Sequence, residues 1–98
     1  MDHELTAKRL SELGHTTRLA VFRLLVRAGN EGLAVGDVQK HLEIPGSTLS
    51  HHLNRLMSVG LIKQRREGRT LYCIAQLDEL RQVMQFLEAE CCTLEREG

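Results

Sequence analysis

Two β-type runs separated by only two residues constrain the fold of this chain most strongly. The runs are LIKQRR (61–66) and RTLYCI (69–74), and Glu67-Gly68 lies between them. A two-residue link that contains glycine is a strong signal for a β-hairpin. The other apolar segments have helical spacing and predict helices over 3–13, 14–29, 36–42, 46–58 and from 77 to the low nineties. The hairpin is therefore set into a chain that is otherwise mainly helical.

The segments around Pro45 have the pattern of a helix-turn-helix followed by a wing. The turn signal Pro45-Gly46 joins the helices expected over 36–42 and 46–58, and the hairpin comes next. On a helical wheel, Leu53 and Leu56 fall within about 40° of Leu49 and mark the buried side of the second helix. The order α-α-α-α-β-β-α predicts a mainly α winged helix-turn-helix fold with a β-hairpin wing. We expect residues 1–98 to form it as a single domain.

The positive charge of the chain is concentrated at this helix and hairpin. The whole sequence is neutral, with 13 basic and 13 acidic residues, but residues 47–73 hold five basic residues against a single acid, Glu67. Ser, Thr, His and Asn side chains on the helix suit base edges, and the cations of the hairpin suit phosphates or a minor groove. The expected partner is therefore nucleic acid, and double-stranded DNA in particular. The expected DNA-contacting residues are Ser47, Thr48, Ser50, His51, His52, Asn54, Arg55, Lys63, Arg65, Arg66 and Arg69.

The adjacent histidines of the second helix differ in what the wheel predicts for them. His51 points outward, whereas His52 lies about 60° from Leu49, at the edge of the buried side. A packed, internally hydrogen-bonded His52 and a His52 that contacts DNA both fit this position. Because neighbours on a helix are about 100° apart, the two rings cannot easily share one metal ion.

Other function classes have less support in the sequence. No apolar run reaches the roughly 18 residues of a membrane span, and the N-terminus lacks the apolar segment of a signal peptide, so we expect a cytoplasmic protein without a membrane partner. The sequence contains no phosphate-binding loop or paired-carboxylate pattern, so we expect neither an enzyme nor a catalytic cofactor. A winged-helix module that binds an acidic protein through its basic hairpin stays open as an alternative. Salt-dependent affinity for duplex DNA would distinguish the two.

The segment STLSHHLNRLMSVGLIKQRREGRTLYCI (47–74) resembles the signature of the ArsR/SmtB family of bacterial winged helix-turn-helix repressors. The family pattern is Ser-x-His-Leu-x-x-Leu, a Gly-Leu step, and a charged hairpin closed by Gly-Arg and a Tyr. The matching residues are Ser50, His52, Leu53, Leu56, Gly60, Leu61, Gly68, Arg69 and Tyr72. LGHTTRLAVFRLLVRAG (13–29) also resembles the family's early helix. The resemblance implies a homodimeric repressor that binds an inverted-repeat operator and is released by a metal, metalloid or thiol-reactive signal.

The apolar residues of the last helix follow a 3-4-3-4-3 spacing, at Leu77, Leu80, Met84, Leu87, Cys91 and Leu94. This heptad-type stripe can either cover the core or pair with a second copy of the chain. Its length and the family resemblance favour pairing, which would place two recognition helices about one DNA turn apart. The expected homodimer interface therefore contains Leu77, Leu80, Met84 and Leu87.

Cys91 and Cys92 are the candidate effector ligands. Adjacent cysteines form a disulfide only with strain, whereas two close thiolates suit a soft, thiophilic ion, and burial as small apolar residues is the other reading. The chain resembles the arsenic-responsive members of the family in which a Cys-Cys pair ends the last helix. That resemblance implies a trivalent arsenic or antimony effector: arsenite, methylarsenite or antimonite. Cys73 is a candidate third ligand or a buried strand residue, and oxidation or persulfidation of the cysteines is the alternative signal.

Overall fold

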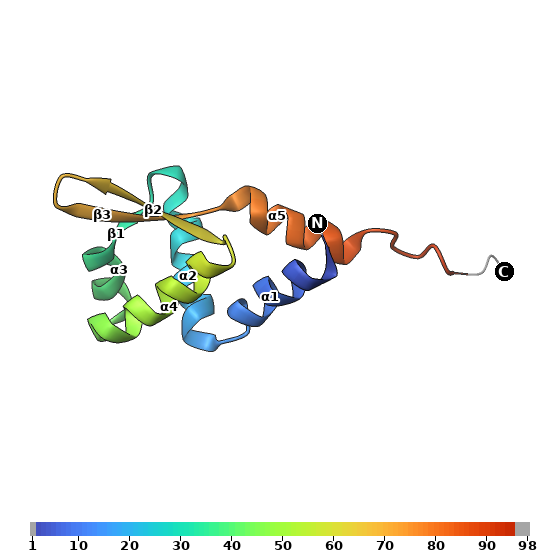
Figure 1. Cartoon of the computed structure of the whole chain (residues 1–98), viewed down its shortest axis with the longest axis horizontal. Helices are drawn as coiled ribbons and strands as arrows, with labels where there is room; N and C mark the ends of the chain where they lie inside the picture. The colour runs from blue at the N-terminus through green and yellow to red at the C-terminus, as the bar shows by residue number, and fades with distance from the viewer. Residues whose placement is uncertain (1, 96–98) are drawn as a thin grey trace.

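The computed structural model describes residues 2–95, which form a helical body with a projecting hairpin (Figure 1). The elements are α1 (His3–Leu13), α2 (Thr16–Ala28), a short 3₁₀ helix η1 (Gly29–Glu31), β1 (Leu33–Ala34), α3 (Val35–Leu42), α4 (Gly46–Ser58), β2 (Ile62–Glu67), β3 (Thr70–Ala75) and α5 (Leu77–Glu88). The predicted fold class, mainly α with a winged helix-turn-helix, is confirmed. In the part of the chain so described, no helix is long and apolar enough to cross a membrane.

The hairpin forms where the sequence predicts it, shifted by one residue. β2 and β3 pair in register from Ile62 opposite Ala75 to Glu67 opposite Thr70, which leaves Gly68-Arg69 as the turn. Gly68 has a φ of 60°, and a glycine of positive φ at the first central position is typical of a type II′ turn. Strand β1, for which the sequence gives no local signal, pairs with β3 and makes β3 the central strand of the order β1-β3-β2.

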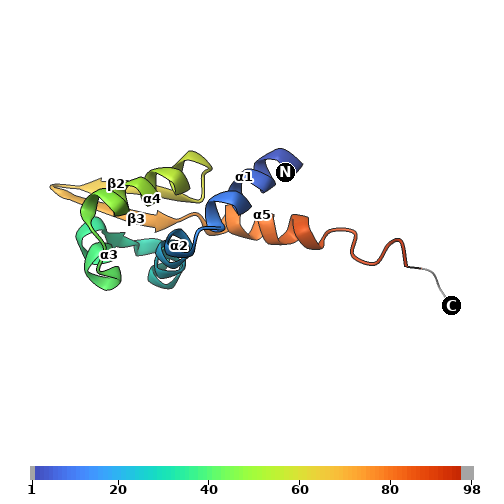
Figure 2. The same ribbon diagram turned by 90° about the horizontal axis from the view of Figure 1, so that it is seen from below.

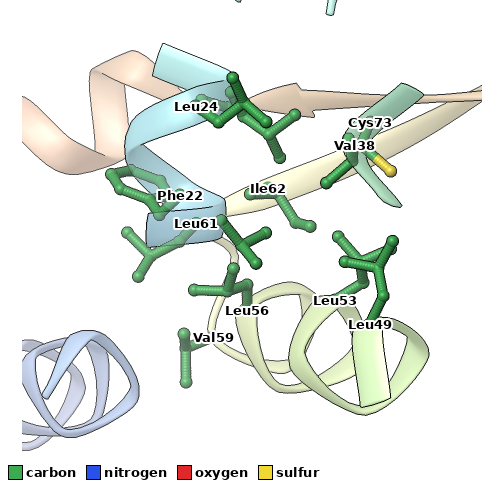
Figure 3. Packing of buried hydrophobic residues seen from close by; sticks show 13 residues of the cluster. Phe22, Leu24, Val38, Leu49, Leu53, Leu56, Val59, Leu61, Ile62 and Cys73 are labelled. Atoms are coloured by element: carbon green, nitrogen blue, oxygen red, sulfur yellow. The ribbon is translucent and has the colours of Figure 1, made fainter. Parts of the chain in front are cut away.

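Helix α4, the second helix of the helix-turn-helix and the expected recognition helix, is held in place by the three leucines that mark its buried side in the sequence. Leu49, Leu53 and Leu56 are all buried, and Figure 3 shows them in one core with side chains from α2, α3 and the strands. Helix α4 packs against α2 and also contacts α1 and β2, and Figures 1 and 2 show it at the edge of the helical body. Burying this stripe leaves the opposite, polar face of α4 toward solvent.

The Gly60-Leu61 step closes α4 and starts the wing. The Gly60 N–H donates to the Met57 carbonyl at 3.0 Å, and the Leu61 N–H donates to the Leu56 carbonyl at 3.1 Å. Together with a φ of 74° at Gly60, these bonds form a Schellman motif, in which the two residues of the 6→1 bond often pack together. Leu56 and Leu61 are both fully buried. The motif gives the physical reason for the Gly-Leu step in the sequence.

The last helix is shorter than the sequence predicts. α5 ends at Glu88 rather than in the low nineties, so the prediction for its C-terminal end was wrong. Glu88 in the last turn and Glu90 beyond it place negative charge at the negative end of the helix dipole, and the last turn contains no basic residue. Residues 87–95 are exposed, so packing does not compensate.

We expect Leu61→Ala to lower the free energy of unfolding by about 2–5 kcal/mol, because truncating a fully buried leucine leaves a cavity. The matched control is Leu94→Ala, at a leucine that is 96% exposed, and it should change stability by less than about 0.5 kcal/mol. Urea unfolding followed by circular dichroism measures both values. Equal effects of the two substitutions would contradict the central place of Leu61 in the core.

Candidate nucleic-acid interface

One side of α4 presents the polar side chains expected to contact DNA. The burial pattern of the helix follows the predicted wheel, because its leucines are buried and its Ser, Thr and Asn residues are exposed. The exposed members of the predicted set on this helix are Ser47, Thr48, Ser50, His51, Asn54 and Arg55. Their side chains offer hydrogen-bond donors and acceptors along a helix that is free to enter a groove.

His52 belongs to the core and not to this exposed face. It is 4% exposed, and its Nδ1 accepts a hydrogen bond from Arg18 Nε at 3.3 Å. Since arginine is always protonated, Nδ1 carries no proton and the ring is neutral. Burial, followed by the charges of Arg18, His15 and His51, lowers the pKa of His52 below its ordinary value. His52 is therefore the packed, internally hydrogen-bonded residue of the two alternatives, and the prediction that it contacts DNA was wrong.

Arg55 is the residue of the exposed set whose guanidinium is already held in an ion pair. Its Nη2 lies 2.8 Å from Glu12 Oε2, and its Nε donates to Glu12 Oε1 at 3.1 Å. Arg18 Nη1 donates to the same Oε1 at 2.7 Å. Sequence reasoning missed Glu12, because it lies 43 residues from Arg55 and no local pattern links the two.

The four cations of the wing lie on two faces of the hairpin. Successive residues of a strand point to opposite faces. One face of β2 meets the helices. It carries Ile62, which belongs to the core, and Gln64, whose amide contacts Cys73 Sγ. Arg66 lies on the same face nearer the tip of the hairpin. Lys63 and Arg65 alternate onto the other face. The cations that are expected from the sequence to form one group are therefore divided between the two faces of the sheet.

Arg65 is also held by neighbours within the wing. Its guanidinium lies over the Tyr72 ring, 5.1 Å from the centroid, and its Nε is 3.1 Å from Glu67 Oε1. Its Nη2 donates to the Glu31 carbonyl at 3.3 Å. Arg66, and Arg69 in the turn, are by contrast exposed at the tip of the hairpin.

The leucines predicted for the dimer interface divide along α5. Leu77 and Leu80 are half-buried and pack against the core cluster, whereas Met84 and Leu87 are 59% and 62% exposed. The first half of the helix therefore covers the core, and the second half offers an apolar surface. Leu10 of α1 is a further exposed large apolar residue.

The two terminal cysteines lie side by side in a segment of turns that follows α5. Their sulfur atoms are 3.0 Å apart, and both residues are exposed. Cys91 is therefore not on a helical seam, contrary to the prediction. The hydrogen bond with Cys91, weak desolvation and the nearby Glu95 raise the pKa of the Cys92 thiol.

Cys73 does not join the terminal pair as a third ligand within one chain. It is fully buried in the middle of β3, and burial raises the pKa of its thiol despite the hydrogen bond from Gln64. Among residues 2–95, no three His, Cys, Asp or Glu side chains come together as a metal site. The buried-strand alternative for Cys73 is therefore the correct one, because its position on the central strand turns its side chain into the core.

Comparison with known proteins identifies the family. Residues 13–65 match the family described as a helix-turn-helix domain. An uncharacterized HTH-type transcriptional regulator of Methanocaldococcus jannaschii is 30% identical over 86 residues, which are 88% of this chain and 94% of the relative. An ArsR-like transcriptional regulator from Rhodococcus sp. RHA1 has the same fold, with a TM-score of 0.83, 22% identity, and coverage of 96% of this chain and 86% of that one. The chain belongs to the ArsR/SmtB family.

Family membership establishes a DNA-binding transcriptional regulator. The family and its fold are those of regulators and not of enzymes. A putative arsenical resistance operon repressor of Halobacterium salinarum is 37% identical over 60 residues, which are 61% of this chain and 46% of that protein. Membership of the family does not by itself specify an effector.

The neutral state of His52 predicts a pH-dependent stability. Below about pH 6.5, the ordinary value for histidine, the unfolded chain binds a proton that folded His52 does not bind. The free energy of unfolding should therefore decrease as the pH is lowered from about 6.5 to the pKa of folded His52. The decrease is at most about 1.4 kcal/mol per pH unit.

His52→Gln tests this linkage, because a glutamine amide oxygen can accept the bond from Arg18 but does not titrate. Urea unfolding of both proteins should show a shallower pH dependence in the variant. His3 and His41 are common to both proteins and are not among the groups that shift the pKa of His52, so they cancel in the difference. Parallel pH profiles would rule out a buried, neutral His52.

Proposed function

We propose that the protein is a homodimeric repressor that binds an inverted-repeat operator and is released by a trivalent arsenic or antimony species. The observation that carries the effector proposal is the exposed thiol pair, with the sulfurs of Cys91 and Cys92 3.0 Å apart. The relation to an arsenical resistance repressor supports the same class of effector. The basic wing and the polar face of α4 support operator binding.

In this proposal α4 reads base edges in the major groove, and its exposed residues from Ser47 to Asn54 make the contacts. Arg66 and Arg69 at the tip of the wing contact phosphates, since they lie on the helix side of the hairpin or in its turn. Lys63 and Arg65 lie on the opposite face of β2, so they are placed outside the interface.

The homodimer forms through the exposed apolar surface of the terminal helices. Met84 and Leu87 of α5 provide it, and Leu10 of α1 extends it, because α1 and α5 contact each other. Burying a half-exposed leucine or methionine yields roughly 25 cal/mol per Å² of apolar surface. Leu77 and Leu80 contribute indirectly by fixing α5 to the core.

Two thiols suit a trivalent arsenical that has two exchangeable positions. In methylarsenite two hydroxyl groups would be replaced by the sulfurs of Cys91 and Cys92, with two As–S bonds formed and two waters released. Arsenite or antimonite would keep one oxygen or take a thiol from outside the chain, since Cys73 is buried in the core. Suppose that the effector weakens operator binding a hundredfold, which corresponds to about 2.7 kcal/mol. By reciprocal linkage, the DNA-bound protein then binds the effector less favourably than the free protein by the same amount.

A redox signal is the second candidate for the same regulator. Two exposed sulfurs at 3.0 Å are also open to oxidation or persulfidation. The agent that releases DNA distinguishes the two signals, and an absence of salt-dependent DNA binding would instead favour a protein-binding module.

The placement of the wing cations predicts different salt dependences for matched variants. Arg66→Gln should weaken DNA binding and reduce the slope of log K against log salt concentration by about 1.8, because it removes one phosphate contact from each protomer of the dimer. Lys63→Gln removes the same charge from the opposite face of β2 and should leave the slope nearly unchanged. Fluorescence anisotropy on promoter DNA over a series of KCl concentrations measures both slopes. A reversed order would place the other face of the wing on DNA.

The effector proposal predicts that arsenite, methylarsenite or antimonite releases the protein from inverted-repeat DNA of its own promoter. Cys91→Ser and Cys92→Ser should each abolish release, because both sulfurs are needed. Cys73→Ala should respond like the wild type, since this residue is buried away from solvent. Anisotropy titrations with these agents, zinc and peroxide provide the measurement.

Three results would contradict parts of this function. Release by peroxide alone would establish the redox signal, and release by arsenite that is lost in Cys73→Ala would restore Cys73 as a ligand. Failure of the wild-type protein to bind the promoter DNA at any salt concentration would refute operator binding itself.

A further inference from the structure

Helix α1 buries two charged side chains against the end of the recognition helix. Arg9 is 7% exposed and Glu12 is 6% exposed. Arg9 Nε donates to the carbonyl of Val59, the C-cap of α4, at 2.8 Å. Glu12 binds Arg55, one turn before that cap. Helix α1, which is not part of the helix-turn-helix, therefore binds α4 at two adjacent points.

The Glu12 carboxylate joins three helices at once. Both of its oxygens bind Arg55 of α4, Oε1 from Nε at 3.1 Å and Oε2 from Nη2 at 2.8 Å, in the two-point geometry that gives arginine–carboxylate pairs their directional strength. Oε1 also accepts from Arg18 of α2 at 2.7 Å, and Arg18 in turn donates to His52 of α4. Two independent chains of polar contacts thus run from Glu12 to the recognition helix.

We propose that Glu12 is a positioning residue for DNA binding: through Arg55 it fixes the orientation of α4, and Arg55 stays on Glu12 when DNA is bound. The proposal rests on the operator binding proposed above. Moving Arg55 to a phosphate would leave Glu12 Oε2, on a side chain that is 8% exposed, without its partner, and an unsatisfied buried acceptor is costly. Arg55 also lies in a surface hollow between α1 and α4, beside Lys8 and Ser58.

Arg55→Lys and Arg55→Gln separate positioning from phosphate contact. Lysine keeps the positive charge but loses the planar fork that binds both carboxylate oxygens. If Arg55 positions α4, both variants should weaken binding to promoter DNA about tenfold, which corresponds to ~1.4 kcal/mol. The slope of log K against log salt concentration should stay at its wild-type value, because no phosphate contact is lost. Arg66→Gln, with its lowered slope, is the control.

The opposite result would overturn the proposal. If Arg55→Lys binds like the wild type while Arg55→Gln lowers the slope by about 1.8, which is one contact in each protomer, then Arg55 is a phosphate contact. If Glu12→Gln binds DNA more tightly than the wild type, then Glu12 only withholds Arg55 from the DNA.

A second measurement does not depend on DNA. It takes account of the lower stability expected of Glu12→Gln, in which two cations lose their buried partner. A double-mutant cycle in urea unfolding compares Glu12→Gln, Arg55→Gln and the double variant. The double variant should be less destabilised than the sum of the single ones. Additive effects would refute the positioning role of Glu12 but would leave the proposed function untouched. Failure of the wild type to bind DNA would refute the proposed function itself.

Discussion

At Leu61 three parts of the molecule are bonded to one another. Its N–H caps the end of α4 through the Leu56 carbonyl, its side chain is fully buried in the core, and its carbonyl accepts from the Gln76 N–H at 2.8 Å, where α5 begins. The recognition helix, the wing and the last helix therefore share one fixed point. The positive φ of Gly60 makes that point accessible to the chain, and the positions of both DNA-facing elements depend on it.

Around this apolar junction the molecule places its charges in two different ways. The cations at the tip of the wing, Arg66 and Arg69, are exposed, so they are available to phosphates. Arg9 and Arg18 are buried and bind a helix cap and a carboxylate, so they serve the fold. The net charge of zero does not show this division, because it counts exposed and buried charges alike. What matters for DNA is the charge that stays exposed near α4, because screening and counterion release act on exposed charge.

The thiol pair, which is the proposed effector site, lies beyond α5 and apart from the proposed DNA face, but packing links the two. α5 leads to Cys91 and Cys92, and its Phe86 packs edge-on against His3 of α1, with ring centroids 4.9 Å apart. α1 in turn contacts α4 through Arg9 and Glu12. Helix α1 thus touches both α5, which leads to the thiols, and α4, the helix proposed to read DNA. The polar contacts between α1 and α4 are directional, so a displacement of α1 would also displace α4.

The sequence by itself determined the elements whose signals are local. The period of Leu49, Leu53 and Leu56 specified the recognition helix and its exposed face, and the glycine between two β-type runs specified the hairpin, because side-chain periodicity and turn conformation depend on neighbouring residues. Strand alternation could separate Lys63 from Arg66, but only the packed helices show which face is which. The tertiary structure alone decided the burial of His52, the pairing of β1, the end of α5 and the bond between Glu12 and Arg55. These depend on contacts between distant parts of the chain, for which many carboxylates and cations are equivalent partners until packing selects one pair.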